Sequence, residues 1–341
     1  MPALNPEALI ENRVAAVREY HEATGLQKAE LDVSGGIDSA VVLMLLARAL
    51  GPENVTAVYS SINSSPESRS RARLVAEAAG VRLVELELTD VYEAIMTEAA
   101  RAMEAAGHDL EEITLRCEND PAIEGSLRSC LRAPVGRFMG RLTGSTLRHG
   151  TGNEDEDRWL RFYQKGGDGE VDTNPLAMLS KGEVYQLAVA LGVPTEIIEA
   201  LPTPDLWGVG EKHNDEEELT RLSGGVEWTY SRVNPQTGEY VRVGTIERMS
   251  RLLDLPLYNG PIIGDPSTLE SCLFQQDMRP IAHKEKVLPA AEKLGLTAEH
   301  LMSARKWERS TRHKMNPNCP SLGSRKALLD AELITDELPA L

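Results

Sequence analysis

A short strand that runs straight into a glycine turn and then into a helix is the feature that most limits how this chain can fold. Residues 31–33 (LDV) have the pattern of a strand, residues 34–39 read SGGIDS, and a helix is predicted from about Asp38 to Leu50. The two glycines let the backbone turn tightly and bring its N–H groups close to an anion. The helix directs its positive N-terminal end to the same place. The sequence therefore predicts a phosphate-binding turn at the carboxyl end of a strand.

The alternation of strands and helices continues after this turn. Residues 54–59 and 81–88 are predicted strands, and residues 66–80 between them are a predicted helix. Strand–helix–strand units of this length form right-handed crossovers, which build a parallel sheet with its ligand site at the carboxyl ends of the strands. We therefore expect an α/β fold with a doubly wound, mainly parallel sheet flanked by helices.

The following segments are predicted from the same periodicity. The first 20 residues suit an amphipathic helix, residues 90–141 are mainly helical, and residues 146–149 return to the sheet. Another helix is expected at residues 179–191. Residues 208–218 are charged and contain glycine, so we expect a mobile loop there.

A hairpin and further helical pieces extend the chain beyond this first unit. Residues 226–233 and 239–243 alternate like two strands, and residues 234–238 (NPQTG) have the composition of a turn between them. The expected division is a first domain at residues 1–222, a hairpin and helical elaboration at residues 223–300, and a C-terminal tail at residues 301–341 that completes the site.

Charge and composition argue against several classes of protein. The formal net charge is −17 and the pI is near 5.0, and so acidic a surface repels the phosphate backbone of nucleic acids. No apolar run approaches the roughly 18 residues that span a bilayer, and the N-terminus lacks a signal-peptide pattern. We therefore expect a cytoplasmic protein that binds neither nucleic acid nor membrane. The cysteines form no CxxC pair, which argues against structural zinc and fits a reducing compartment. They are Cys117, Cys130, Cys272 and Cys319.

The side chains of the glycine turn indicate which phosphate chemistry it serves. Ser34 and Ser39 add hydroxyl donors, whereas Asp38 would repel phosphate unless it helps to hold Mg²⁺ between pyrophosphate oxygens. The turn lacks the lysine of a Walker A motif, so it suits release of pyrophosphate better than transfer of a γ-phosphoryl group. The prediction is a Mg²⁺–ATP site at which the bond between the α- and β-phosphates is cut.

The stretch SGGIDSA resembles the pyrophosphate loop of the N-type ATP pyrophosphatases, and a second block indicates the member. Residues 150–181 (GTGNEDEDRWLRFYQKGGDGEVDTNPLAMLSK) are similar, at nearly unchanged spacing, to the NAD synthetase block GTGNxxE, KYGDGGxD, PL and LxK. Residues 201–206 (LPTPDL) resemble that family's PTADL, and residues 313–314 match its HK. The chain is therefore identified as a member of the ammonia-dependent NAD synthetase family, which implies an adenine nucleotide alpha hydrolase-like fold.

The resemblance assigns roles to the residues at matching positions. It implies that Asp38 and Glu156 bind Mg²⁺, and that Asp38, Lys181 and Asp172 take part in catalysis. The residues expected at ATP are Ser34, Gly35, Gly36, Asp38, Ser39, Ser65, Thr151, Lys181 and Thr203. Those expected at the carboxylate substrate are Arg132, Lys165, Asp168, Asp172, His313 and Lys314.

The resemblance also implies a reaction. The substrate carboxylate attacks the α-phosphorus of ATP, pyrophosphate leaves, and ammonia converts the acyl-adenylate to an amide with release of AMP. Positioning and electrostatic stabilisation carry most of such a transfer, so no side-chain nucleophile is required. A carboxylate such as Asp172 could accept the proton that ammonium must lose. The implied substrate is nicotinate adenine dinucleotide, the product is NAD, the cofactor is Mg²⁺, and the family's dimeric state implies a homodimer.

Four positions depart from the family's pattern and leave the carboxylate substrate open. The family has an Asn followed four residues later by Arg, whereas this chain has Ser126 and Cys130 and keeps only the next arginine, Arg132. Gly166 stands where the family has Tyr, and Arg71 where it has Asp. The alternative is therefore an NAD synthetase-like amide ligase that acts on a different carboxylate.

Overall fold

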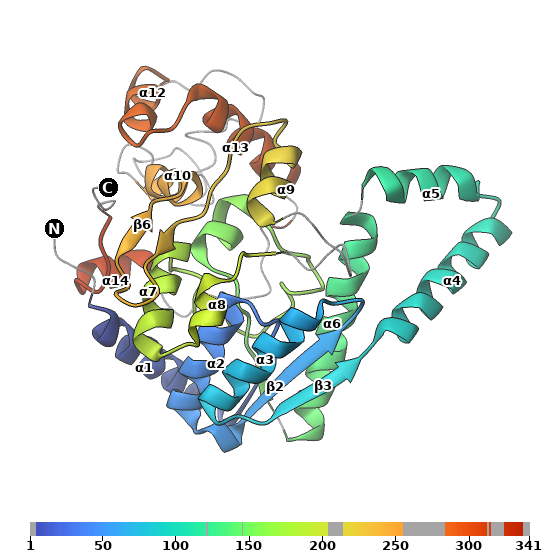
Figure 1. The fold of residues 1–341 in the computed structure, drawn as a ribbon, viewed down its shortest axis with the longest axis horizontal. Helices are drawn as coiled ribbons and strands as arrows, with labels where there is room; N and C mark the ends of the chain where they lie inside the picture. The colour runs from blue at the N-terminus through green and yellow to red at the C-terminus, as the bar shows by residue number, and fades with distance from the viewer. Residues whose placement is uncertain are drawn as a thin grey trace.

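A parallel sheet forms the centre of the computed structural model, which describes residues 5–120, 122–144, 146–203, 214–254, 284–311, 314 and 324–336 (Figure 1). The strand order is β3-β2-β1-β4, and every neighbouring pair is parallel. These strands are β1 (Lys28–Asp32), β2 (Val55–Ser61), β3 (Leu83–Glu87) and β4 (Thr146–Arg148). Because β1 and β4 are neighbours, the glycine turn after β1 and the GTGN segment after β4 emerge side by side at the same edge of the sheet.

Helices cover both faces of the sheet. The helices α2 and α3 make right-handed crossovers toward β3 and therefore share one face, where α1 and α7 pack beside α2. The helix α6 leads back to β4 on the other side of β1 and contacts β1, β2 and β4 from the opposite face. The elements are α1 (Pro6–Thr24), α2 (Ile37–Leu50), η1 (Pro52–Asn54), α3 (Pro66–Ala79), α6 (Ala122–Leu142) and α7 (Lys181–Leu191). The predicted doubly wound α/β fold is confirmed.

Two helices form an arm that projects from the rest of the molecule in Figure 1. They are α4 (Thr89–Ala105) and α5 (Leu110–Asn119). Tyr92 is the one buried residue that α4 contributes, and α5 contributes none. The arm therefore adds almost nothing to the hydrophobic core. No helix in the described ranges is both long and apolar enough to cross a bilayer.

A second hydrophobic cluster joins the segment after β4 to the predicted elaboration. Trp159 and Leu160 belong to the π-helical turn η2, and they pack with Trp228 and Tyr230. The rings of Trp159 and Trp228 have centroids 5.0 Å apart. The remaining elements are η2 (Asp155–Leu160), α8 (Thr195–Glu199), α9 (Asp215–Leu222), β5 (Arg232–Val233), β6 (Tyr240–Arg242), α10 (Thr245–Asp254), α12 (Lys284–Lys293), α13 (Ala298–Thr311) and α14 (Arg325–Asp330).

The predicted hairpin is present, but its ladder is short. Strand β5 pairs antiparallel with β6, and the Asn234 side chain closes the turn by accepting hydrogen bonds from the backbone N–H groups of Gln236 and Thr237 at 2.9 and 3.1 Å. Residues 226–231 do not pair as a strand, because the backbone N–H groups of Trp228, Thr229 and Tyr230 donate to side chains instead. The acceptors are Thr220, Thr245 and Glu216.

The predicted loop at residues 208–218 is wrong from residue 215, where α9 begins. The Asn214 side chain accepts a hydrogen bond from Glu217 N at 3.0 Å, and the Glu217 carboxylate accepts one from Asn214 N at 3.1 Å. This reciprocal capping box starts a helix in a segment that the charge run made look irregular. Residues 208–213 lie outside the described residues.

Two buried histidines meet where α1 ends beside β4. His21 Nδ1 lies 2.7 Å from the Leu26 carbonyl oxygen, so it carries the proton and leaves His21 Nε2 as an acceptor. His149 Nε2, 3.0 Å from His21 Nε2, must then donate. His149 Nδ1 has no hydrogen-bond partner among the described residues. Burial lowers the pKa of His149 to about 3, with the neighbouring His21 adding to the shift, and burial also lowers the pKa of His21.

We expect this pair to make the protein less stable in mild acid. The unfolded chain, in which a histidine has a pKa of about 6.5, binds more protons than the folded chain between about pH 6.5 and pH 3. The free energy of unfolding should therefore decrease as the pH is lowered through that window, by up to about 1.4 kcal/mol per pH unit. Urea unfolding between pH 7 and pH 4 should show a shallower fall for His149→Gln, which keeps an N–H donor but does not titrate. The control is His108→Gln, at an exposed histidine. An equal pH dependence in wild type and His149→Gln would contradict this assignment.

Candidate active site

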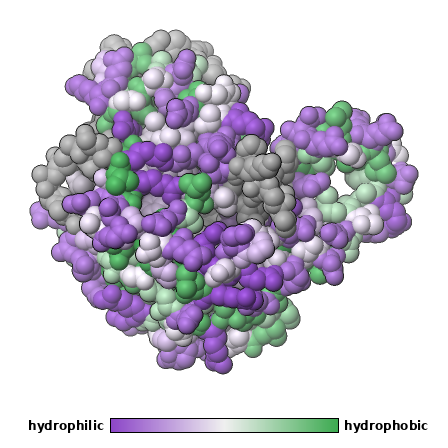
Figure 2. Space-filling view, viewed as in Figure 1, coloured by the Kyte–Doolittle hydropathy of each residue, from purple (hydrophilic) through white to green (hydrophobic). Residues whose placement is uncertain are grey.

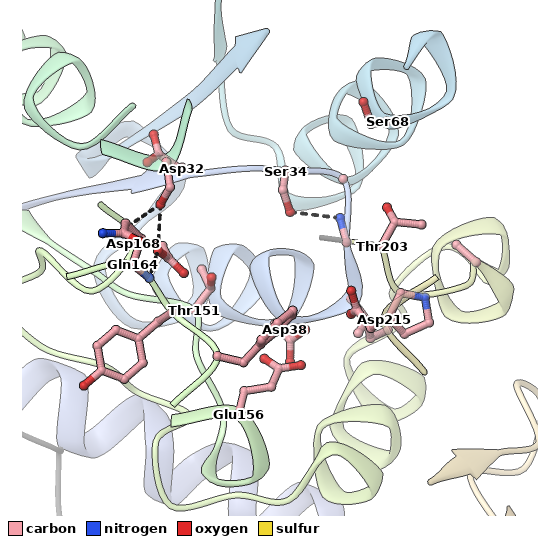
Figure 3. A pocket seen from close by; sticks show the side chains of 18 of the residues that line it. Asp32, Ser34, Asp38, Ser68, Thr151, Glu156, Gln164, Asp168, Thr203 and Asp215 are labelled. Carbon is pink, nitrogen blue, oxygen red and sulfur yellow. Dashed lines mark hydrogen bonds between the residues drawn. The ribbon is translucent and has the colours of Figure 1, made fainter. Parts of the chain in front are cut away.

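A cavity of about 380 Å³ opens at the carboxyl ends of β1 and β4 (Figure 3). Its walls come from the glycine turn, α3, α6, the segment after β4, α7 and the chain after α8. It brings together predicted residues that are far apart in the sequence. Those that line it are Ser34, Gly35, Gly36, Asp38, Thr151, Glu156, Lys181, Thr203, Arg132, Asp168 and Lys314.

The glycine turn is ordered by its own hydrogen bonds. Ser34 Oγ accepts a hydrogen bond from Gly36 N at 3.2 Å and lies 3.1 Å from Ser39 Oγ, which donates to the Gly36 carbonyl oxygen at 3.0 Å. Gly35 has a φ of +83°, and a Cβ atom there would overlap the Ser68 carbonyl oxygen of α3. Both the backbone angle and the close approach therefore require glycine at position 35.

Asp38, Glu156 and Lys181 form an ion triplet that lines the cavity. Lys181 Nζ is 2.6 Å from Asp38 Oδ2 and 2.8 Å from Glu156 Oε1. The two carboxylates point toward each other in Figure 3. Asn153 holds both acidic residues, because its Nδ2 donates to Asp38 Oδ1 at 2.9 Å and its Oδ1 accepts from Glu156 N at 3.1 Å. The triplet joins α2, η2 and α7.

The Lys181 ammonium attracts both carboxylates of the triplet, whereas the two carboxylates repel each other. Lys181 is 2% exposed, and burial would lower its pKa, but the Asp38 and Glu156 carboxylates together raise that pKa well above its ordinary value. Burial raises the pKa of Glu156, Lys181 opposes this shift, and Asp38 adds to it. The lysine is therefore a cation at neutral pH.

Local structure fixes the position of Lys181 in the first turn of α7. Ser180 caps this helix, since its Oγ accepts from Glu183 N at 3.3 Å while the Glu183 carboxylate accepts from Ser180 N at 2.8 Å. The backbone N–H of Lys181 donates to Asp155 Oδ2 at 2.9 Å. Its side chain and its backbone thus both bind η2, the turn that carries Glu156. A π-helical turn is rare and is often found at functional sites.

The carboxylate pair fits a Mg²⁺ ion. Lys181 Nζ contacts both Asp38 and Glu156, so these two carboxylates lie close together and would hold a Mg²⁺ ion between them and the substrate phosphates. Mg²⁺ commonly binds one or two carboxylates together with substrate phosphates and water. The described ranges contain no group of three or more His, Cys, Asp or Glu side chains that could hold a metal. Phosphate oxygens and water would therefore have to complete the shell.

The other half of the cavity is formed by α6 and the loop after η2. Ser129 Oγ donates to Asp168 Oδ1 at 2.7 Å and accepts from Asp168 N at 3.0 Å. Gln164 N donates to the same carboxylate oxygen at 2.7 Å. A Cβ atom at Gly167 would overlap Ser129 Oγ, so this contact requires a glycine. Asp168 therefore positions the loop as well as lining the cavity.

Lys314 and Arg132 bring basic side chains to this half. Lys314 Nζ donates to the carbonyl oxygens of Arg161, at 2.9 Å, and Tyr163. Burial lowers the pKa of Lys314. Arg132 Nε donates to the Ser60 carbonyl oxygen, near the end of β2, at 3.1 Å. Both cations are tied to backbone carbonyl groups and face the same space.

Several predicted site residues are not among the residues that line the cavity. Ser39 is hydrogen-bonded to Ser34 within the glycine turn, and Ser65 caps α3 by accepting a hydrogen bond from Ser68 N at 3.2 Å. Lys165 does not line the cavity. His313 lies outside the described residues.

Asp172 also lies away from the cavity lining. Its carboxylate accepts hydrogen bonds from Arg137 Nη1 at 3.1 and 3.2 Å and from the backbone N–H of Arg148 at 2.7 Å. It therefore binds α6 to the end of β4, and these donors already engage it.

Other side chains line the same cavity, although the sequence patterns predict no site role for them. Arg71 Nε donates to the Gly35 carbonyl oxygen at 3.0 Å, which places its guanidinium beside the glycine turn. Asp32 lines the cavity and forms an ion pair with Arg148 of β4. The sequence carries a signal for Asp32, because this carboxylate interrupts a short predicted strand two residues before the glycine turn. Asp215, on α9, has no such local signal.

Comparisons with known proteins agree with this geometry and confirm the resemblance seen in the sequence. The family model described as NAD synthase matches residues 9–223. The NH(3)-dependent NAD(+) synthetase of Methanococcoides burtonii is 34% identical over 199 residues, 58% of this chain and 68% of the relative. That of Alkaliphilus oremlandii is 33% identical over 218 residues, 63% of this chain and 81% of the relative. The structure of NMN synthetase from Francisella tularensis shares the fold, with a TM-score of 0.60 at 18% identity over 93% of this chain and 100% of that chain. The chain therefore belongs to the NAD synthase family of ATP-dependent carbon–nitrogen ligases.

Proposed function

We propose that the protein uses ATP to adenylylate the carboxylate of nicotinate adenine dinucleotide, and that ammonia then forms NAD with release of AMP and pyrophosphate. The observation that carries this proposal is the ion triplet of Asp38, Glu156 and Lys181, in the same cavity as the glycine turn. The relatives named as NH(3)-dependent NAD(+) synthetases support it.

The residues of the first half act on the triphosphate. The backbone N–H groups of the glycine turn and the Ser34 hydroxyl bind phosphate oxygens, and Thr151 and Thr203 add donors from the facing walls. The Lys181 ammonium stabilises the charge that develops around the α-phosphorus. Asp38 and Glu156 would hold Mg²⁺, which supplies charge neutralisation to the pyrophosphate when it is bound.

The residues of the second half act on the acid. Arg132 and Lys314 bind its anionic groups, and Asp168 orients the loop that faces it. Ammonium must lose a proton before it attacks. Asp172 lies outside the cavity lining and is engaged by Arg137 and Arg148. We therefore assign this proton to a carboxylate of the lining such as Asp32, whose Oδ2 pairs with Arg148 while its Oδ1 has no hydrogen-bond partner in the described part of the chain.

We also propose that residues 1–222 form the catalytic domain and that residues 223–300 and 301–341 complete it. The match of the NAD synthase model to residues 9–223 supports the first boundary. Lys314, from the tail, lines the cavity and supports the second.

A different carboxylate is the second candidate substrate. Ser126 lines the cavity where the family pattern has Asn, and its hydroxyl donates back to the Ile123 carbonyl oxygen at 2.8 Å. Gly166 has a φ of +83°, and a Cβ atom added there would meet open space, so the position of the family's Tyr is a turn glycine here. Ser126 thus changes the lining of the half of the cavity that we assign to the acid, and Gly166 removes an aromatic side chain from the loop that carries Asp168.

A panel of acids separates the two candidates. With ATP, Mg²⁺ and ammonium present, we expect pyrophosphate and AMP to form with nicotinate adenine dinucleotide and not with nicotinate, nicotinate mononucleotide or aspartate. Pyrophosphate release can be followed by a coupled assay and the amide product by mass spectrometry. Inertness toward the dinucleotide with activity on another acid would establish the second candidate. Formation of ADP and orthophosphate would refute both.

We expect Asp38→Ala and Glu156→Ala each to lower turnover at least about 100-fold, because each removes one of two metal-binding carboxylates. Each variant should also weaken Mn²⁺ binding in the presence of ATP, measured by electron paramagnetic resonance. The charge-matched control is Asp90→Ala, at an exposed position of the first turn of α4. Near-normal turnover in either site variant would refute the metal assignment.

We propose a homodimer in which the arm of α4 and α5 is covered by the partner. Figure 2 shows hydrophobic side chains among the charged ones on this arm. Val91, Ile95, Met103 and Leu115 are exposed there, and Leu115 is 56% exposed. An apolar surface on an arm without a core of its own favours burial against a partner.

Replacement of these side chains should break the dimer. We expect Ile95→Glu combined with Leu115→Glu to shift the mass measured by light scattering from two chains to one. Val241→Glu, at a hydrophobic residue on the hairpin that is 60% exposed, is the control and should leave the mass unchanged. A wild-type protein of single-chain mass at micromolar concentration would reject the dimer.

A further inference from the structure

The chain beyond the family match packs onto the lysine of the candidate active site. Figure 1 draws β6 and α10 in the same part of the molecule as α7, and β5 contacts α7 directly. Tyr230 precedes β5, is fully buried, and places its ring centroid 5.1 Å from Lys181 Nζ. The Lys181 ammonium therefore contacts an aromatic face in addition to the carboxylates of Asp38 and Glu156.

The same segment also binds the groups that hold the Lys181 backbone. Ser250 Oγ, on α10, donates to Asp155 Oδ1 at 2.6 Å, and the other oxygen of Asp155 accepts the Lys181 N–H. Glu247, one turn earlier, accepts a hydrogen bond from Ser180 Oγ at 3.1 Å. Ser180 and Asp155, which hold the start of α7, are thus both contacted by α10.

Buried charges and a close approach complete this contact. Arg251 lies 3.3 Å from Glu183 of α7 and 3.6 Å from Glu154, which directly precedes η2. A Cβ atom at Gly182 would overlap the hydroxyl of Tyr240, so the residue after Lys181 must be glycine for β6 to pack there. The elaboration is therefore fitted to the start of α7 and to η2 at once.

We propose that Tyr230, which comes from the chain beyond the family match, is a positioning residue of the catalytic centre that fixes the Lys181 ammonium between Asp38 and Glu156. An ammonium group over an aromatic face is attracted by the ring quadrupole, most strongly where water is excluded. Because Lys181 is 2% exposed, the ring replaces water as a neighbour of the charge. The ring leaves the N–H groups available to carboxylate and phosphate oxygens, which a hydrogen-bonding neighbour would not.

The hydroxyl of Tyr230 is not required by this role. Its oxygen is buried without a hydrogen-bond partner in the described part of the chain, and burial raises its pKa well above the ordinary value. Phenylalanine would keep the aromatic face and remove this unsatisfied group. We therefore expect phenylalanine at position 230 to preserve activity and an aliphatic residue there to lower it.

The first test compares three variants by kinetics and thermal unfolding. The kinetic arm rests on the proposed function and uses pyrophosphate release with the acid that the panel identifies. Tyr230→Phe should keep kcat within about twofold, whereas Tyr230→Leu should lower kcat about 10- to 30-fold with little change in the KM of the acid. Met249→Ala, which truncates another fully buried side chain of the same cluster, controls for lost packing and should lower the unfolding temperature without this loss of kcat.

The second test needs no substrate, so it stands even if the proposed reaction is wrong. Tyr230→Leu should shift the urea unfolding midpoint further in the wild-type background than in Lys181→Gln, because the glutamine has no charge for the ring to stabilise. If Tyr230→Leu does not fold, Tyr230→Met replaces it in both tests. Equal shifts in the two backgrounds would overturn the proposal. So would a Tyr230→Phe variant as impaired as Tyr230→Leu, or a Met249→Ala variant that loses kcat equally.

Discussion

The structure of the site depends on one ammonium group held by two carboxylates. Lys181 reaches Asp38 and Glu156 at 2.6 and 2.8 Å from an almost completely buried position. A buried charge is costly unless it is paired and hydrogen-bonded. The pairing therefore forces α2, η2 and α7 to meet with little freedom, and the surrounding structure serves to hold those three segments in place.

Each of the three segments has its own support. The glycine turn and Asn153 fix Asp38, the capping box of Ser180 and Glu183 fixes the start of α7, and Asp155 links that start to η2. The second hydrophobic cluster then packs η2 against the elaboration. The elaboration is thus in direct contact with two of the segments that carry the ion triplet, α7 and η2.

Strong local patterns made most of the fold predictable. The parallel sheet follows from short apolar runs that alternate with helices, and the phosphate turn follows from SGGIDS between a strand and a helix. The predicted secondary structure is wrong at two segments, each of which carries a second local pattern. The charged segment before Leu219 has the composition of a loop, but Asn214 and Glu217 have the spacing of a capping box and begin a helix. Residues 226–231 alternate like a strand, but this alternation reflects the burial of Trp228 and Tyr230 in a cluster.

The sequence by itself determined the fold class and a glycine turn suited to phosphate, because these depend on residue type and short spacing. The pairing of Asp38 with Glu156 as candidate metal ligands followed from the resemblance to a family, because these residues are far apart in the sequence. Only the tertiary structure decided that Asp172 is engaged by Arg137 outside the cavity, that Arg71 lies beside the glycine turn, and that Tyr230 covers Lys181. Those contacts join residues that are 35 to 49 positions apart and lie on different segments of the chain. Their existence depends on how helices and loops pack in space, which no local pattern of residues specifies.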